Sequence, residues 1–529
     1  MLFPDDSHAA RSVGFSIVAN AKGAADSTLL NSHGLTPLTR PSKIIDASGP
    51  TFYSGVPVTV MGLGGFGGGV AVAKFLASQG AKVTVTDLNT KDELQDSLTL
   101  LNEYEIDRFF LGGHPEEAFT DCQMLVVNPA VKPDNPIVAA VRMRGIEVTT
   151  EIALFLKHNP APVIAVTGSN GKSTTTALIH HLLLHAQTDP SPADTNHSVA
   201  VTQIWLGGNI GISLLEHLPV ISADDIVILE LSSFQLEMLR ATGFCPKVAV
   251  LTNFTPNHLD WHGTEAAYQA AKQVLFNDQT ADEVAIVPDT PGQDAPPVVW
   301  KTRAQRLVFG LTDAGEDGAF LDGGDLVLRS ARGFFEDTVR VAVPSQLPGA
   351  HNRLNIAAAA CAAWQAGADP DRFSSALKSF KALPHRLQMV AEHSGRQFWN
   401  DSIATTPESA IMALRVFSRR IILLAGGYDK GQDLSSFAAE IRRHAKAVVY
   451  MGQTGGVLRN LVSSGESGCL KTVCEGKDFA DAFAQAVALT VQGDIVLLSP
   501  GCASYGWFRD YRDRGNQFTQ LAREWRPVE

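Results

Sequence analysis

One stretch of the chain, residues 163–176, constrains its fold more than any other. It reads VIAVTGSNGKSTTT, in which β-branched apolar residues stop at Gly168 and Lys172 opens a segment compatible with a helix. Strand, glycine turn and helix in this order form a phosphate-binding loop, because glycines let backbone N–H groups approach phosphate oxygens at a helix N-terminus. We therefore expect an α/β fold with a phosphate site at this turn.

The residue types of this loop have separate tasks. Lys172 is expected to reach the β- and γ-phosphates of a nucleotide, and a hydroxyl of Ser173 or Thr174 to hold Mg²⁺. Val166 stands where the general pattern has a glycine, so the loop is the shorter form GSNGKS. The alternative is a glycine turn that only begins a helix. The predicted phosphate contacts are Gly168, Ser169, Asn170, Gly171, Lys172, Ser173 and Thr174.

Length and charge limit the remaining possibilities. A chain of 529 residues is too long for one ordinary core and predicts about three domains. The formal net charge of −12 argues against a nucleic-acid partner, which needs a basic face. The six cysteines form no CxxC pair, and we find neither a signal peptide nor an apolar run long enough to span a membrane. These features predict a cytoplasmic protein without a membrane anchor.

A second glycine turn lies nearer the N-terminus. A predicted strand from Val56 leads into GLGGFG, with Gly62, Gly64 and Gly67 in the spacing GxGxxG, and Asp87 ends the next strand. An acid about 20 residues after such a turn completes a Rossmann-type nucleotide fingerprint, which by itself would suit NAD. The alternative is that the glycines serve only close packing. Further predicted strands, at 124–127 and around 146–149, continue the alternation of strands and helices.

Polar residues follow the predicted strands of the central region. Glu230 ends the apolar run Ile226–Leu229, where a carboxylate in a phosphate-loop protein usually faces Mg²⁺; a surface-facing Glu is the alternative. Asn209, in the turn GGNIG, is placed to reach a ligand, although alone it would be a plain turn residue. We interpret VAVLTNFTPNHLDWHG as a strand that ends in Asn257, His258 and Asp260, on the same rim; a structural His–Asp pair is the alternative.

Lys272 lies among alanines and aliphatic residues in the predicted helix TEAAYQAAKQVLF. Its default role is that of a lysine whose amine extends to solvent. If it is buried, its amine pKa falls, and a neutral amine can react with CO₂ to give a carbamate with hard oxygen ligands for Mg²⁺. The sequence leaves both possibilities open.

The segments GSNGKST, GGNIG, LELSSFQLE, NHLD and AAK, in this order, resemble the Mur ligases, and among them those that add glutamate to UDP-N-acetylmuramoyl-L-alanine. The resemblance covers about residues 56–525 and implies three α/β domains. These are a Rossmann-like UDP-binding domain (51–157), a central ATP-binding P-loop domain (158–382) and a C-terminal Rossmann-like domain that receives glutamate and closes over ATP (383–529). Residues 1–50 would form a poorly ordered extension.

The resemblance also implies the reaction and its cofactors. The chain would be an ATP-dependent amide ligase that adds D-glutamate through an acyl phosphate, in cytoplasmic peptidoglycan precursor synthesis. Lys172, His258 and Lys272 would be catalytic, and two Mg²⁺ ions would be held by Ser173, Thr174, Glu230, His258 and a carbamylated Lys272. We expect a monomer with no nucleic-acid or membrane partner.

Substrate contacts are implied residue by residue. Further ATP contacts are assigned to Asn352, Asn355, Asp401 and the pair His385 and Arg386. The UDP-linked substrate, rather than NAD, is assigned to Gly62, Gly64, Gly65, Phe66, Gly67, Asp87, Leu88, Asn89, Asn128 and Asn209. Glutamate is assigned to Thr405, Lys430, Ser504 and Tyr511.

Two positions depart from the family pattern. Asn257 stands where the family usually has Asp, and Ile403 where many of these ligases have Lys. An aliphatic side chain cannot pair with a carboxylate, so Lys430 would supply the main charge for glutamate, and addition of L-glutamate becomes an alternative. A folylpolyglutamate synthase would lack the N-terminal UDP domain. A silent nucleotide-binding regulator would not need Lys172, Glu230, His258 and Lys272 together.

Overall fold

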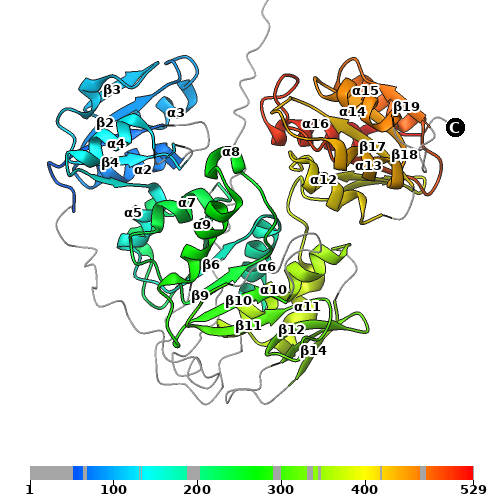
Figure 1. The fold of residues 1–529 in the computed structure, drawn as a ribbon, viewed down its shortest axis with the longest axis horizontal. Coiled ribbons are helices and arrows are strands. Elements are labelled where there is room, and N and C mark those ends of the chain that lie inside the picture. The colour runs from blue at the N-terminus through cyan, green and yellow to red at the C-terminus, as the bar shows by residue number, and fades with distance from the viewer. Residues whose placement is uncertain are drawn as a thin grey trace, which may run out of the picture. The chain divides into compact units, whose positions relative to one another are not determined.

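The computed structural model describes residues 52–63, 68–129, 131–132, 134–186, 203–211, 213–289, 300–329, 338–343, 347–417, 420–464 and 472–527. Predictions for residues 1–50 and for Gly64, Gly65, Phe66 and Gly67 lie outside this part of the chain. The described elements form three sheets with helices between their strands, which is the expected α/β fold (Figure 1). Among the described residues, no helix is both long and apolar enough to cross a membrane.

The first sheet is wholly parallel, with strand order β3-β2-β1-β4-β5. The direction of strand addition reverses beside β1, and open α/β sheets bind ligands at the carboxyl ends of strands at such a point. This places the turn after β1 and Asn128, which follows β4, at one edge. The elements are β1 (Pro57–Met61), α2 (Gly68–Ser78), β2 (Lys82–Asp87), α3 (Gln95–Thr99), β3 (Arg108–Leu111), η1 (Glu116–Phe119), β4 (Met124–Val127), α4 (Pro136–Met143) and β5 (Glu147–Thr149).

The second sheet has nine strands in the order β14-β13-β12-β11-β10-β9-β6-β8-β7. β6 (Val163–Thr167) is buried throughout and lies between β8 (Ile226–Glu230) and β9 (Val248–Leu251), both parallel to it. The carboxyl ends of these three strands therefore meet where the phosphate loop begins. The other strands are β7 (Ile204–Gly208), β10 (Val284–Pro288), β11 (Gln305–Phe309), β12 (Gly318–Asp322) and the antiparallel β13 (Asp325–Arg329) and β14 (Val339–Val341).

The helices around this sheet include α5 (Glu151–His158), α6 (Lys172–His185), η2 (Leu215–Val220), α7 (Ser233–Leu239), α8 (Leu259–His262) and α9 (Glu265–Asn277). The prediction that the strand near residue 250 runs on to His258 is wrong. β9 ends at Leu251, because Thr252, Asn253 and Thr255 leave the ladder to bond the phosphate loop. His258 is instead the residue before α8, with φ of 54°.

The third sheet has the order β15-β16-β20-β17-β18-β19, parallel except for the β15–β16 hairpin. Its central strands β17 and β20 are almost completely buried, which fits their continuous apolar sequences. The elements are β15 (Gln388–His393), β16 (Arg396–Asn400), α12 (Pro407–Leu414), β17 (Ile421–Gly426), α13 (Ser435–His444), β18 (Ala445–Met451), α14 (Gly455–Ser463), β19 (Thr472–Glu475), α15 (Phe479–Ala488), β20 (Ile495–Leu498) and α16 (Tyr511–Glu524).

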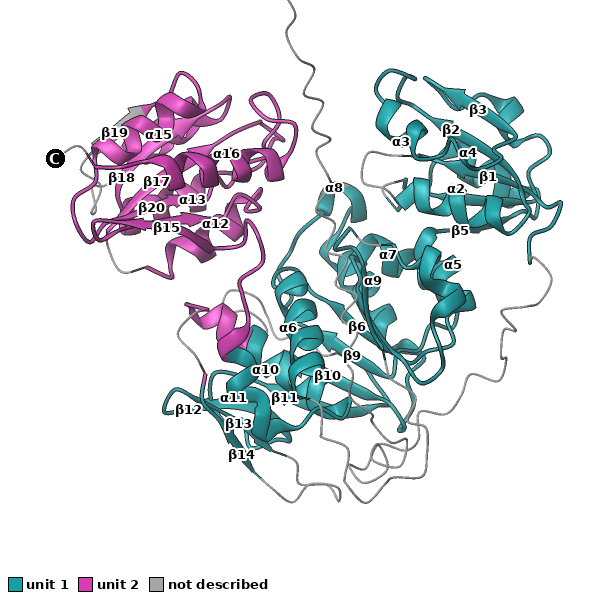
Figure 2. Ribbon diagram, turned by 180° about the vertical axis from the view of Figure 1, so that it is seen from behind, with its two compact units in different colours: residues 1–342, 355–377 teal, residues 343–354, 378–529 magenta. Residues whose placement is uncertain are grey.

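The chain divides into two compact units, residues 1–342 with 355–377 and residues 343–354 with 378–529 (Figure 2). The first unit contains the first two sheets, and the second contains the third. Helix α10 (Ala350–Gln365) is divided between them. Helix α11 (Phe373–Ser379) follows α10 after Gly367, which has φ of 95°, and after the short turn η3 (Pro370–Arg372).

Candidate active site

The phosphate loop has the backbone that its glycines predict. Gly171 caps α6 in the left-handed region at φ of 78°, and Gly168 has φ of 149°. A Cβ at Gly171 would lie 2.3 Å from Oδ1 of Asn355, and one at Gly168 would lie 1.9 Å from Oγ1 of Thr252. Both positions therefore require glycine, and the N-terminus of α6 presents its backbone N–H groups without a capping side chain.

The segment after β9 supports the loop from one side. Asn170 exchanges two hydrogen bonds with the Asn253 side chain: its N–H donates to Oδ1 at 2.9 Å and its carbonyl accepts from Nδ2 at 3.0 Å. Oγ1 of Thr252 donates to the same carbonyl at 2.5 Å. Ser169 Oγ lies 3.0 Å from the Tyr268 hydroxyl and accepts from the Thr255 N–H at 2.9 Å. The shape of the loop is therefore braced by the chain's own side chains.

Glu230 lies at the end of β8, only 2% exposed, next to the start of α6. The Ser173 hydroxyl donates to its Oε2, and Nδ2 of Asn209 donates to its Oε1 at 2.8 Å. A hydroxyl beside a buried carboxylate is the oxygen donor pair of a phosphate-loop Mg²⁺ site. Thr174 is half-buried on the same helical turn. Asn209, assigned above to the UDP-linked substrate, is thus placed beside Glu230.

Two lysines converge on the carbonyl of Gly168. Nζ of Lys172 donates to it at 3.1 Å and to the Ser169 carbonyl at 3.0 Å, and Nζ of Lys272 donates to it at 2.8 Å. Lys272 is 1% exposed, and its amine lies 4.5 Å from the centre of the Tyr268 ring. Burial and then the charge of Lys172 hold the pKa of Lys272 well below its usual range, against the opposing effect of Glu230. Lys272 is therefore buried, and its amine does not extend to solvent.

His258 is exposed, and its ring packs against Phe234 at 4.9 Å and Tyr268 at 6.3 Å between centroids. Because the Lys272 amine also lies over the Tyr268 ring, the structure brings His258 and Lys272 to one aromatic side chain. Tyr268 was missed by the sequence reasoning. It precedes Lys272 by four residues on α9, and this helical spacing was a usable signal.

The two candidate asparagines of α10 are placed differently. Asn355 accepts a hydrogen bond from the Thr175 hydroxyl at 3.3 Å and lies against Gly171, so it belongs to the phosphate loop. Asn352 donates to the carbonyl of Pro348 at 2.9 Å and belongs to the second compact unit.

The first sheet gathers several of the residues assigned to the UDP-linked substrate. Gly62 has φ of 94°, and a Cβ there would lie 3.1 Å from Cβ of Asn128. Asp87 is buried and accepts from the N–H of Asn89 at 2.8 Å, whereas Leu88 is exposed. The glycine that lets α2 approach the turn is Gly69, where a Cβ would lie 2.4 Å from the Gly62 carbonyl; the fingerprint spacing did not single it out.

In the second unit, Asp401 is hydrogen-bonded to the segment that contains His385 and Arg386. Asp401 is 7% exposed and accepts hydrogen bonds from the Leu387 N–H at 3.1 Å and the Ser499 hydroxyl at 2.8 Å. His385 and Leu387 have φ of 63° and 43°, an unfavourable backbone for residues other than glycine. The carboxylate therefore helps to hold the strained backbone that carries Arg386.

Burial raises the pKa of Asp401 to about 7, although its hydrogen bonds oppose this shift. At a pH below 3.8, the ordinary pKa of an aspartate side chain, the carboxyl is protonated in both the folded and the unfolded chain. As pH rises towards 7 the unfolded chain binds fewer protons than the folded chain. The stability gained by burying the neutral carboxyl is therefore lost, by on the order of 4 kcal/mol.

As pH rises from 4 to 8, we expect the thermal midpoint of the wild type to decrease relative to that of Asp401→Asn. Asp92→Asn serves as the control, because Asp92 is exposed, and its thermal midpoint should follow that of the wild type at each pH. The prediction is contradicted if the thermal midpoints of Asp401→Asn and Asp92→Asn depend on pH in the same way.

Three of the residues assigned to glutamate lie on loops of this unit, and the fourth begins a helix. Thr405 follows β16, Lys430 follows β17, Ser504 follows β20, and Tyr511 begins α16. Ser504 is buried, Thr405 and Tyr511 are half-buried and Lys430 is exposed. Ile403, the departure noted above, is half-buried.

Arg514, which the sequence reasoning missed, joins the loops of Thr405 and Ser504. Its fully buried guanidinium donates to the Ser402 carbonyl at 2.7 Å and to the Cys502 carbonyl at 3.1 Å. Its position on α16 offers no motif from which this role could be recognised.

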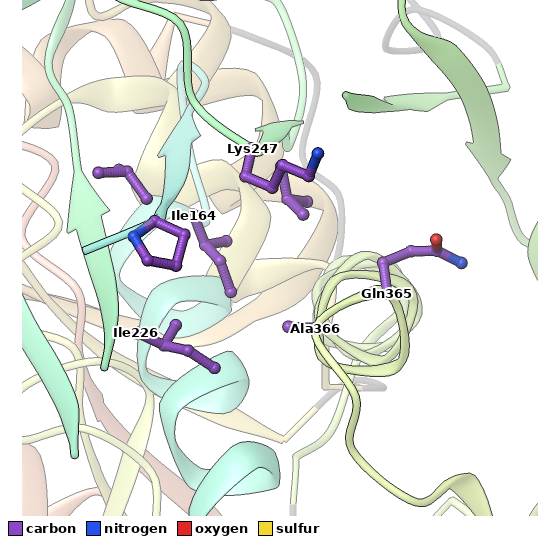
Figure 3. A pocket seen from close by; sticks show the side chains of 8 residues that line it. Ile164, Ile226, Lys247, Gln365 and Ala366 are labelled. Carbon is purple, nitrogen blue, oxygen red and sulfur yellow. The ribbon is translucent and has the colours of Figure 1, made fainter. Parts of the chain in front are cut away.

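The described surface also has a small apolar hollow at the opposite, amino-terminal edge of the second sheet (Figure 3). Its lining includes Ile164, Ile226 and Ala366, and its volume of about 20 Å³ is roughly that of one water. It is too small for a nucleotide and has no part in the site.

Three family models match the chain. The Mur ligase MurD-like N-terminal domain matches residues 57–150, the Mur ligase middle domain residues 166–363, and the Mur ligase glutamate ligase domain residues 385–502. Similar curated proteins include the UDP-N-acetylmuramoylalanine–D-glutamate ligase of Roseiflexus sp., 39% identical over 88% of this chain and 98% of its own length. That of Pelotomaculum thermopropionicum is 35% identical over 87% and 96%.

Solved structures with a similar fold are more distant in sequence. The UDP-N-acetylmuramate-alanine ligase MurC of Thermotoga maritima has a TM-score of 0.54 at 19% identity, covering 88% of this chain and 99% of its own. The MurF ligase of the same organism, in complex with ADP, has a TM-score of 0.51 at 16% identity, covering 90% and 96%. These likenesses show the three-domain α/β fold.

Proposed function

Because the chain belongs to the Mur ligase family, we propose that it joins D-glutamate to UDP-N-acetylmuramoyl-L-alanine with ATP, in peptidoglycan precursor synthesis. The observation that carries this proposal is the likeness to D-glutamate ligases along nearly the whole chain. The phosphate loop, with Lys172 and Ser173 beside Glu230, supports it independently.

A magnesium ion fits the donor set at Glu230. Mg²⁺ prefers hard oxygen ligands and often takes one or two carboxylates together with substrate phosphates. The Ser173 hydroxyl and the Glu230 carboxylate supply such oxygens, and Asn209 orients the carboxylate through its other oxygen. We assign this metal to Ser173, Thr174 and Glu230. When bound, it would offset the negative charge of ATP and the acceptor.

The reaction begins with an activation step, because a free carboxylate is a poor acyl donor to an amine. The γ-phosphoryl group of ATP passes to an oxygen of the muramoyl-alanine carboxylate, which gives an acyl phosphate and ADP. The amine of glutamate attacks the acyl carbon, loses a proton, and phosphate leaves. Lys172, at the N-terminus of α6, would stabilise the charge on the transferring phosphoryl group.

Lys272 is proposed to act as a carbamate. Its buried amine has a strongly lowered pKa, and a neutral amine can take up CO₂. The modified side chain would offer oxygens for a second Mg²⁺, with His258 as the nitrogen ligand. The observation that supports this pairing is that both side chains contact Tyr268.

The substrate contacts are proposed as follows. The turn at Gly62 with Asp87 and Asn128, at the carboxyl edge of the first sheet, would hold the UDP group. Asn352, Asn355, Arg386 and Asp401 would contact ATP, and Thr405, Lys430, Ser504 and Tyr511 would receive glutamate. The domain boundaries given above stay part of this proposal. A reducing, cytoplasmic location is supported by Cys122, Cys245, Cys361 and Cys502, which are free thiols.

The test is phosphate release from ATP in the presence of UDP-N-acetylmuramoyl-L-alanine and each glutamate enantiomer. We expect release with D-glutamate and little with L-glutamate. Preference for L-glutamate would correct the stereochemistry and give Ile403 a role in it. Absence of turnover with both enantiomers would contradict the ligase proposal and favour a nucleotide-binding regulator.

A further inference from the structure

Two loops at the carboxyl edge of the third sheet are joined closely. Tyr428, after β17, and Ala503, after β20, form an isolated antiparallel bridge in which the Tyr428 N–H donates to the Ala503 carbonyl at 2.8 Å. A Cβ at Gly427 would lie 2.2 Å from the same carbonyl, so only glycine allows this approach. The loop that carries Lys430 is thereby fixed to the loop that carries Ser504.

The two loops connected by this bridge also carry a pair of aromatic side chains in contact. The rings of Tyr428 and Tyr505 meet edge to face at 5.8 Å, although the residues are 39% and 49% exposed. Side chains this exposed add little to a core. Because they are large and partly apolar, their placement beside a predicted substrate residue needs another explanation.

The amine of Lys430 lies 5.5 Å from the centre of the Tyr505 ring, within the range of a cation–π interaction. In the part of the chain that the structure describes, Lys430 forms no ion pair. The ring therefore restricts the long lysine side chain without neutralising its charge, which leaves the ammonium available to an anion.

We propose that Tyr505, braced by Tyr428, is a positioning residue that holds the Lys430 ammonium for a carboxylate of the incoming amino acid. This inference rests on the proposed function. Ile403 stands where many of these ligases have a second lysine. A single ammonium group that is held in place can supply part of the carboxylate binding that two mobile lysines would give.

The test compares three variants of the full chain in the phosphate-release assay. An exposed cation–π contact of this kind corresponds to a change of about two- to fivefold in binding. Tyr505→Leu is therefore expected to raise KM for D-glutamate by about two- to fivefold, with kcat and the KM values for ATP and the UDP-linked substrate unchanged. Tyr505→Phe keeps the aromatic face and is expected to behave as the wild type.

Trp507→Leu is the matched control, because Trp507 is an exposed aromatic residue of the same loop that contacts Phe508. It should leave KM for D-glutamate unchanged. The proposal is overturned if Tyr505→Leu leaves this KM unchanged, if Tyr505→Phe is as impaired as Tyr505→Leu, or if all three KM values rise together. A wild type that shows no turnover with either glutamate enantiomer would instead overturn the proposed function.

Discussion

Replacing Lys172 with alanine is expected to lower ATP-dependent phosphate release by about 100-fold or more, the usual effect of removing one group that stabilises transition-state charge. Nζ of Lys172 donates to the carbonyls of Gly168 and Ser169, so the amine is held at the mouth of the loop. Alanine is a strong helix former and leaves the first turn of α6 intact. The loss should therefore come from phosphate stabilisation rather than from unfolding.

Lys157→Ala is a suitable control for this variant, because Lys157 lies on α5 and makes an exposed ion pair with Glu147 at 3.3 Å. It should retain activity. The thermal midpoint of Lys172→Ala should stay close to that of the wild type. Near-normal phosphate release by a folded Lys172→Ala chain would remove the phosphate loop from the mechanism.

Lys272→Ala is expected to lose most of its activity and to recover part of it when a short carboxylate such as acetate is added. If the working form is a carbamate, the lost groups are its oxygens, and a carboxylate in the space left by the side chain can replace them. Burial of the residue supports this, because the space is enclosed against Tyr268 and the Gly168 carbonyl. The measurement is phosphate release against acetate concentration.

Lys272→Met provides the matched comparison, since it removes the amine but fills the same space. It should be inactive and should not respond to acetate. Wild-type activity in Lys272→Ala would show that the amine has no part in the reaction. Loss of activity without rescue in the alanine variant, at unchanged thermal midpoint, would contradict the carbamate.

The strands and helices next to the phosphate loop were predictable because their sequence signals are local. The run from Val163 to Thr167 and the turn before Lys172 have the bounds that the pattern indicated. Glu230 was found because a carboxylate at the end of a buried strand needs a partner, and the Ser173 hydroxyl is one such partner.

Two of the missed residues, Asn253 and Arg514, act over long distances in the sequence. Asn253 bonds Asn170 from 83 positions away, and Arg514 bonds Ser402 from 112 positions away. Periodicity and turn chemistry carry no information on such pairs. The error over residues 252–258 has the same origin, because the segment reads as a continuing strand until its contacts with the loop are known.

The division of helix α10 has a practical consequence for fragments of this protein. Its first residues group with the second compact unit and the rest with the first, so the chain passes between the units within one continuous helix as well as near residues 342 and 377. A single cut near residue 378 would separate residues 343–354 from the rest of the unit with which they pack. Isolated halves are therefore poor reagents for measuring substrate affinities, and binding experiments belong on the intact polypeptide.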